Sequence, residues 1–81
     1  MRKEVQVMGV GSRKTGLSKK GQKYDFTEVS ISYPDEKFKG FKAETVNFDA
    51  AIVGERVIAP GDILDVVMHQ ANFKTYIDAI L

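Results

Sequence analysis

The chain has 81 residues, 43% of them hydrophobic and 28% charged, with no cysteine, one histidine and a formal net charge of +1. This length predicts one domain with a small core, and the composition excludes a collagen-like or disordered chain. Without cysteine there are no disulfides, and His69 alone cannot build a structural zinc site. Because a second subunit is the remaining route to extra burial, we expect a homodimer.

The charged residues are unevenly distributed along the chain. Up to Tyr24, seven basic residues are opposed only by Glu4, whereas beyond Tyr24 ten acidic residues face five basic ones. The near-neutral total therefore conceals a basic N-terminal part, which indicates a polyanionic partner. No run of residues is apolar and long enough to be a signal peptide or to span a bilayer. We expect a cytoplasmic protein, in the host cytoplasm if it is viral, with no membrane partner.

Residues 4–10 alternate in polarity and predict a first strand. Residues 11–23 are polar, basic and interrupted by Gly16 and Gly21, and they predict a long protruding hairpin. The hairpin has five cations and no acid, which favours contacts with a phosphate backbone over an ordinary solvated loop. These candidate phosphate contacts are Arg13, Lys14, Lys19, Lys20 and Lys23.

Residues 24–33 are rich in aromatic and β-branched residues and predict a second strand, but its alternation changes phase. The apolar residues of its second half share one face: Val29, Ile31 and Tyr33. Tyr24 and Phe26 fall on the other face. Either a bulge near residues 27–28 returns these two rings to the core, or they face solvent. Their position beside the basic hairpin favours the second alternative, in which they stack on the bases of a single strand.

Residues 38–48 predict a third strand, with a bend at Gly40 and a second change of phase. We assign its phenylalanines, Phe38, Phe41 and Phe48, mainly to the core. Lys42 is included among the candidate DNA contacts, because it either extends the cationic track or solvates the strand. One helical turn is expected around residues 50–52.

Pro60 and Gly61 form a turn signal that opens a fourth strand over residues 63–68. Residues 73–81 fit either a fifth strand or a short helix capped by Asn72. The strand is favoured because residues 69–72 are short enough for a hairpin loop. Phe73, beside Lys74, is a candidate base contact, with a core or interface role as the alternative. About five short strands predict an all-β domain over residues 1–81, a five-stranded antiparallel barrel like the oligonucleotide/oligosaccharide-binding (OB) fold.

The sequence contains no complete enzyme signature. Residues 11–18 have the glycine spacing of a phosphate-binding loop, but Leu17 stands where that motif requires lysine. His69 has no recognisable nucleophile partner, and the carboxylates are scattered along the chain. We therefore expect no catalytic residues, no metal site and no cofactor.

Residues 14–26, Lys-Thr-Gly-Leu-Ser-Lys-Lys-Gly-Gln-Lys-Tyr-Asp-Phe, resemble the gene V single-stranded DNA-binding proteins of filamentous bacteriophages. The shared pattern is a basic residue, small-Gly-apolar-Ser, a basic pair, Gly, and Tyr two positions before an apolar residue. A second match is Ala59-Pro60-Gly61, followed by an apolar strand and a hairpin with an exposed phenylalanine. The resemblance covers most of the chain after Ser12.

The resemblance implies an OB-type barrel that forms a symmetric dimer and coats single-stranded DNA cooperatively. By matched position, Lys14 and Lys19 would contact phosphates, Tyr24 and Phe26 would stack on bases, and Phe73 would contribute from the neighbouring hairpin. Two segments depart from the family pattern, a shorter hairpin loop at residues 69–72 and a longer connection before Pro60. The resemblance therefore bears more directly on the DNA site than on the dimer contact.

These observations together predict a non-sequence-specific single-stranded DNA-binding protein that protects a phage or plasmid replication intermediate. Two other functions use the same surface. One is RNA binding with translational repression, because stacking and phosphate contacts also occur with RNA. The other is a protein-interaction module in which Tyr24, Phe26 and Phe73 anchor a partner.

Overall fold

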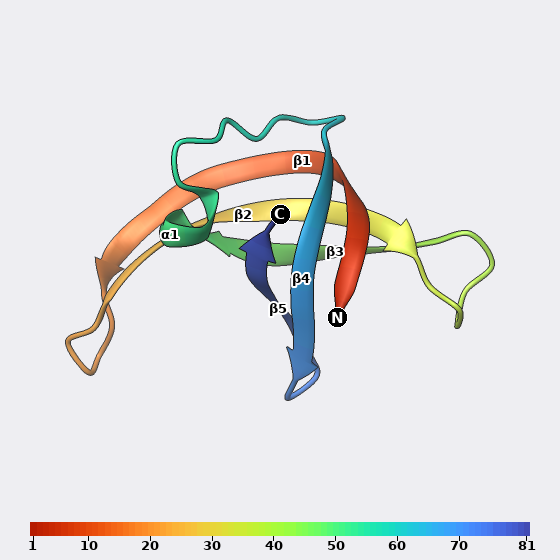
Figure 1. The fold of residues 1–81 in the computed structure, drawn as a ribbon. Helices are drawn as coiled ribbons and strands as arrows, with labels where there is room; N and C mark the ends of the chain where they lie inside the picture. Colours follow the sequence, from red (N-terminus) through yellow and green to blue (C-terminus); the bar gives the residue numbers. More distant parts are fainter.

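The computed structural model describes residues 1–81 as one antiparallel sheet of five strands and a single helical turn (Figure 1). The elements in chain order are β1 (Arg2–Leu17), β2 (Lys23–Pro34), β3 (Phe41–Asp49), α1 (Ala50–Val53), β4 (Ile63–Ala71) and β5 (Lys74–Ile80). The strand order across the sheet is β3-β2-β1-β4-β5. The predicted all-β, five-stranded antiparallel architecture is confirmed. No helix is long and apolar enough to cross a membrane.

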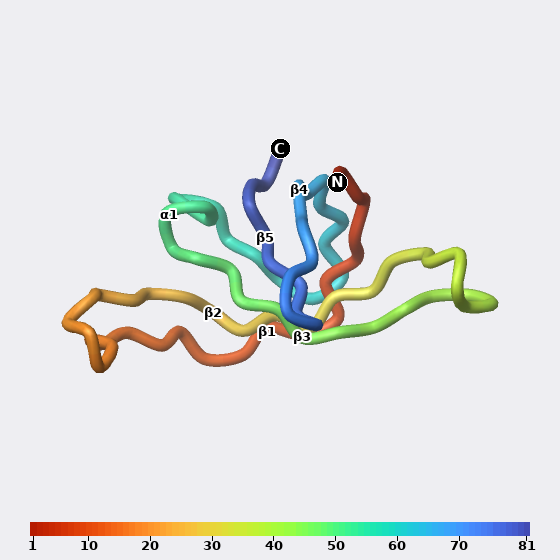
Figure 2. Tube along the Cα trace, turned by 90° about the horizontal axis from the view of Figure 1, so that it is seen from below, coloured from red at the N-terminus to blue at the C-terminus, as the bar shows by residue number.

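The two longest strands, β1 and β2, form an arch that extends well beyond the rest of the molecule (Figure 1). Seen from below, the β1–β2 tip and the β2–β3 loop point in opposite directions, and β4, β5 and α1 lie between them (Figure 2). The predicted hairpin over residues 11–23 is therefore mostly strand, and only residues 18–22 form its turn. These polar residues can form a long β-ladder because cross-strand side-chain pairs stabilise it where there is no packed core.

The bulges lie in β1, whereas β2 is regular. Three residue steps in β1, from Val10 to Arg13, face two steps in β2, from Val29 to Thr27, and a similar extra residue occurs after Val7. A bulge near residues 27–28 of β2, the less favoured of the two alternatives, is absent, because the β2–β3 register runs without a shift from Phe26 to Pro34. The extra residues bend β1 and let the arch curve without changing the alternation of β2.

The hydrophobic core is small and lies where the inward faces of the strands meet. Its apolar members are Val5, Val7, Val29, Ile31, Tyr33, Val46, Phe48, Val66, Met68 and Ile77. The predicted inward residues of β2, Val29, Ile31 and Tyr33, all belong to this set. Alternation in the fourth strand predicts Leu64, Val66 and Met68 as inward residues, and Val66 and Met68 are in the core whereas Leu64 is only half-buried. Only 11 of 81 residues are buried, so a single chain encloses little apolar volume.

Two phenylalanines assigned to the core are exposed. Phe38 lies in the β2–β3 loop, and Phe41 faces outward at the start of β3. Since β3 alternates without a bulge, the inward position of Phe48 forces Phe41 onto the outer face. Lys42 and Glu44 occupy the inward positions instead.

The C-terminal segment is a strand, as expected, and its hairpin turn is tighter than predicted. His69 and Gln70 belong to β4, and the turn consists of Asn72 and Phe73, with φ angles of 54° and 62°. Two successive left-handed residues make the turn that best matches the twist of a hairpin, where asparagine and glycine are usual. Phe73 takes the glycine position, which strains the backbone.

The sheet is open along one seam, so the expected closed barrel is not formed by backbone hydrogen bonds. β3 and β5 approach each other, but no ladder joins them. At this seam the Tyr33 hydroxyl of β2 donates to Glu44 of β3 over 2.5 Å. This bond joins β2 to β3, and the side-chain link across the seam is the one between Glu44 of β3 and Thr75 of β5.

Candidate nucleic-acid interface

Lys14, Gly16, Tyr24 and Phe26 share one face of the β1–β2 hairpin. Gly16 pairs with Tyr24 and Lys14 with Phe26, and residues paired directly across a ladder point to the same side. Tyr24 keeps 41% of its surface exposed, and Phe26 is half-buried. Of the two alternatives for these rings, the structure therefore has the outward-facing one.

The Tyr24 ring lies across Gly16. A Cβ atom added to Gly16 would sit 2.5 Å from the Tyr24 hydroxyl oxygen, so only glycine leaves room for the ring in this position. The Tyr24 and Phe26 ring centroids are 5.8 Å apart, with their planes tilted by 39°. The hairpin therefore presents two neighbouring aromatic rings beside Lys14.

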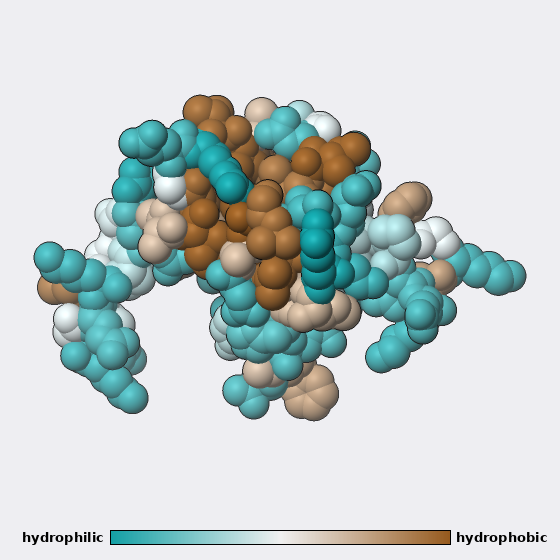
Figure 3. Space-filling model, in the orientation of Figure 1, coloured by the Kyte–Doolittle hydropathy of each residue, from teal (hydrophilic) through white to brown (hydrophobic).

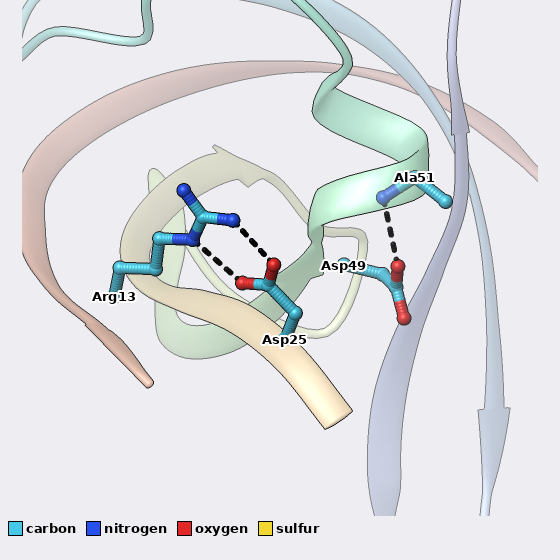
Figure 4. Close-up of polar contacts among 4 residues, drawn as sticks. All are labelled: Arg13, Asp25, Asp49 and Ala51. Atoms are coloured by element: carbon cyan, nitrogen blue, oxygen red, sulfur yellow. Dashed lines mark hydrogen bonds and ion pairs between the residues drawn. The ribbon is translucent and has the colours of Figure 1, made fainter. Parts of the chain in front are cut away.

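Two of the five hairpin cations are paired with acids of β2. Arg13 donates from Nε to Asp25 over 2.7 Å and from Nη2 to the second carboxylate oxygen (Figure 4). This hydrogen bonding and the charge of Arg13 lower the pKa of Asp25. Lys14 is paired with Glu28. The hairpin is acid-free only in sequence, because these carboxylates reach back from the opposing strand.

The cations that remain without an ion pair gather at the end of the hairpin: Lys19, Lys20 and Lys23. Lys23 pairs with Leu17 on the face opposite Tyr24. Arg13 is also on that opposite face, because it pairs with Thr27. The nine predicted contacts thus do not form one flat surface, and the tip lysines are the cations most available to an outside anion.

Lys42 and Phe73 lie far along the chain from the hairpin but line one open groove of about 560 Å³ between β3 and the β4–β5 turn. Lys42 is half-buried, and its Nζ lies 3.5 Å from Glu44 Oε2, whereas Phe73 is fully exposed at the turn. Lys74 and Thr75 also line this groove. The structure therefore brings together two predicted contacts, Lys42 and Phe73, at the open seam of the sheet.

A second groove, of about 440 Å³, continues from the first along the same seam. Lys74 and Thr75 line both grooves, and Phe26 lines the second. The two grooves connect Phe26 of the hairpin with Lys42 and Phe73. Sequence reasoning missed two rings of this second groove, His69 and Tyr76. In each strand the ring lies next to an inward apolar residue, Met68 or Ile77, and this alternation was the signal available in the sequence.

The pKa values of two polar groups under the seam, Tyr33 and Glu44, are shifted in opposite directions. Burial raises the pKa of Tyr33 well above its usual value, and its hydrogen bond to Glu44 adds to the shift. Burial by itself would raise the pKa of Glu44 too, but hydrogen bonds from Thr75 and Tyr33, with the charge of Lys42, lower it. Glu44 therefore stays ionised at neutral pH and holds Lys42 at the groove.

The chain brings no three His, Asp or Glu side chains together in a group that could bind a metal ion. The grooves combine aromatic rings, the two lysines Lys42 and Lys74, neutral polar groups and the carboxylates of Glu44, Asp49 and Asp78. The rings and lysines are the groups that suit binding of a flexible polyanion with flat apolar parts. Comparison with protein-family models, with curated proteins and with solved structures finds no match for this chain.

Proposed function

We propose that this protein binds single-stranded DNA with little sequence preference. The observation that carries the proposal is the hairpin, where Tyr24 and Phe26 are neighbouring outward-facing rings and Lys19 and Lys20 at the tip have no acidic partner. Rings stack on any base, and lysines neutralise phosphates without requiring a fixed base geometry. Duplex DNA offers no base faces to such rings.

The strand order supports the same proposal. An OB fold is a five-stranded, partly open barrel that binds oligonucleotides on one face. The order β3-β2-β1-β4-β5, with β3 and β5 brought close, corresponds to such a barrel opened at one seam. The gene V pattern over residues 14–26 includes the hairpin tip and both rings. We therefore propose an OB-like protein of gene V type that protects a single-stranded replication intermediate.

Replacing Lys19 and Lys20 together by alanine is expected to weaken binding equally for oligonucleotides of different sequence. Each lost phosphate contact removes about 0.7 from the slope of log affinity against log salt concentration for a single strand. The double variant should therefore lower the slope by about 1.4. The measurement is a salt-dependent titration followed through tyrosine fluorescence.

The matched control is Lys37→Ala with Lys39→Ala, which removes the same charge from the loop at the opposite end of the molecule (Figure 1). This control should leave the slope unchanged. Equal slopes for both double variants would mean that general charge, not the hairpin, attracts the strand. A salt-insensitive wild-type protein would point to a protein partner, and tighter binding of a matched RNA strand would point to RNA.

We also propose that the protein is a homodimer. The core of a single chain is small, and Figure 3 shows an apolar area in the centre of the molecule, over the region of α1, β4 and β5, between hydrophilic ends. Partly buried apolar residues of this region are Ile52, Val53, Leu64 and Ile80. Light scattering at high protein concentration should give the mass of two chains, and the mass of one chain would contradict the proposal.

A further inference from the structure

A pair of stacked rings on the outer face of the β4–β5 hairpin has no part in the hairpin contacts on which the proposed function rests. His69 and Tyr76 pair across the hairpin, with ring centroids 5.1 Å apart and planes only 15° from parallel. Tyr76 leaves 38% of its surface exposed. Tyrosine is enriched in binding interfaces relative to the rest of a protein surface.

The His69 ring is held in place by Asp78. His69 Nδ1 lies 2.7 Å and 2.9 Å from the two carboxylate oxygens. The register between β4 and β5 shifts between Val67 and Met68, and Asp78 is the extra residue that this shift leaves in β5. Bulges commonly re-aim a side chain at a binding site. Here the bulged residue is the one that fixes His69 against Tyr76.

The His69–Tyr76 stack lines the 440 Å³ groove together with Phe26 of β2, so aromatic rings from three strands line one opening. Asn47 and Asp49 of β3 line it as well. A nucleobase has the two properties that this lining requires, an aromatic face for the rings and polar edges for the amide and the carboxylate. Asp49 Oδ1 already accepts a hydrogen bond from the Ala51 N–H over 2.9 Å, so its second carboxylate oxygen and the Asn47 amide are the groups left for a base edge (Figure 4).

The charges indicate how a nucleotide would lie. Asp49 and Asp78 line the groove, and the single lysine that lines it, Lys74, has its Nζ over the Tyr76 ring, 5.5 Å from the ring centroid. A base that stacks on this face of Tyr76 would displace the flexible Lys74 side chain from the ring. Lys74 also lines the neighbouring groove with Lys42. A phosphate would be repelled by the aspartates and attracted to the two lysines, so the base would enter the groove and its phosphate would point toward Lys74.

We propose that Tyr76, supported by His69, is a base-stacking subsite for one nucleotide of a single strand, with Lys74 as its phosphate contact. This inference rests on the proposed function and adds a site between the hairpin rings and Phe73. A strand bound at Tyr24 and Phe26 would then continue along the open seam instead of leaving the protein at the hairpin.

The test compares binding of an oligothymidylate of about 16 nucleotides with binding of an abasic chain of equal phosphate number. Tyr76→Ala should weaken oligothymidylate binding by about 5- to 150-fold and leave abasic binding unchanged. Lys74→Ala should weaken both. Tyr76→Phe keeps the ring and should restore wild-type affinity, while Phe38→Ala, an exposed ring outside the groove, is the control. Melting temperatures are recorded for every variant.

The outcomes separate this inference from the proposed function. If the wild-type protein fails to bind oligothymidylate, both are wrong. If it binds with the slope change predicted for Lys19 and Lys20 but Tyr76→Ala binds normally, only the subsite is wrong. An equal loss for Tyr76→Ala on the abasic chain would show that the ring acts through the fold, and would also overturn the subsite.

Discussion

Replacing Phe48 by alanine is expected to destabilise the protein by about 3–5 kcal/mol, the usual cost of removing a large buried aromatic ring. Phe48 is completely buried on the inward face of β3. A domain of this size has a total stability on the order of 4–12 kcal/mol, so the loss is about a quarter of that total or more, and the melting temperature should fall by more than about 10 °C. Thermal and urea unfolding, followed by circular dichroism at one fixed protein concentration, measure the effect.

The matched control is Phe41→Ala on the same strand. Phe41 is 70% exposed, so its loss should change the free energy of unfolding by no more than about 0.5 kcal/mol. A similar large loss for both variants would mean that Phe41 is covered, as in a dimer interface. A small loss at Phe48 would contradict the core described for this chain.

The contrast between Phe41 and Phe48 also shows where sequence reasoning fails. Strand existence follows from β-branched and aromatic content, and all five strands were predicted with small errors at most ends. Inward and outward faces follow from alternation only if apolar residues keep to one face. In β3 they do not, because Lys42 and Glu44 occupy inward positions where Tyr33 and Thr75 satisfy the carboxylate. A buried polar network of this kind leaves no pattern in the sequence.

The candidate site was predicted in part for similar reasons. The alternation of β2 placed Tyr24 and Phe26 opposite Val29, and the structure has them there. The electrostatics of the hairpin depended on cross-strand pairs instead. Arg13 meets Asp25 and Lys14 meets Glu28 only once the register is known, and that register includes two bulges in β1. Local composition overestimates the free positive charge when the opposing strand supplies acids.

Replacing Tyr24 by alanine is expected to lower the affinity for single-stranded DNA by about 1–3 kcal/mol, or roughly 5- to 150-fold, through loss of one stacked base. Stability should change little, because the ring is exposed and packs mainly on Gly16 and Phe26. Oligonucleotide titration and thermal unfolding of the same variant give both quantities. A severe loss of stability with normal affinity per folded molecule would rule out a stacking role for Tyr24.

Gly16 provides an independent test of the same ring. The backbone of Gly16 is not in the left-handed region, so alanine is compatible with the strand, but its Cβ would overlap the Tyr24 hydroxyl. The end of the tyrosine side chain can move aside, so Gly16→Ala should fold normally and displace the ring. Its affinity loss should be at most that of Tyr24→Ala and should vanish in the Tyr24→Ala background, since both act through one side chain. Additive losses would mean that Gly16 contacts the strand by itself, with its backbone close to a phosphate or a base.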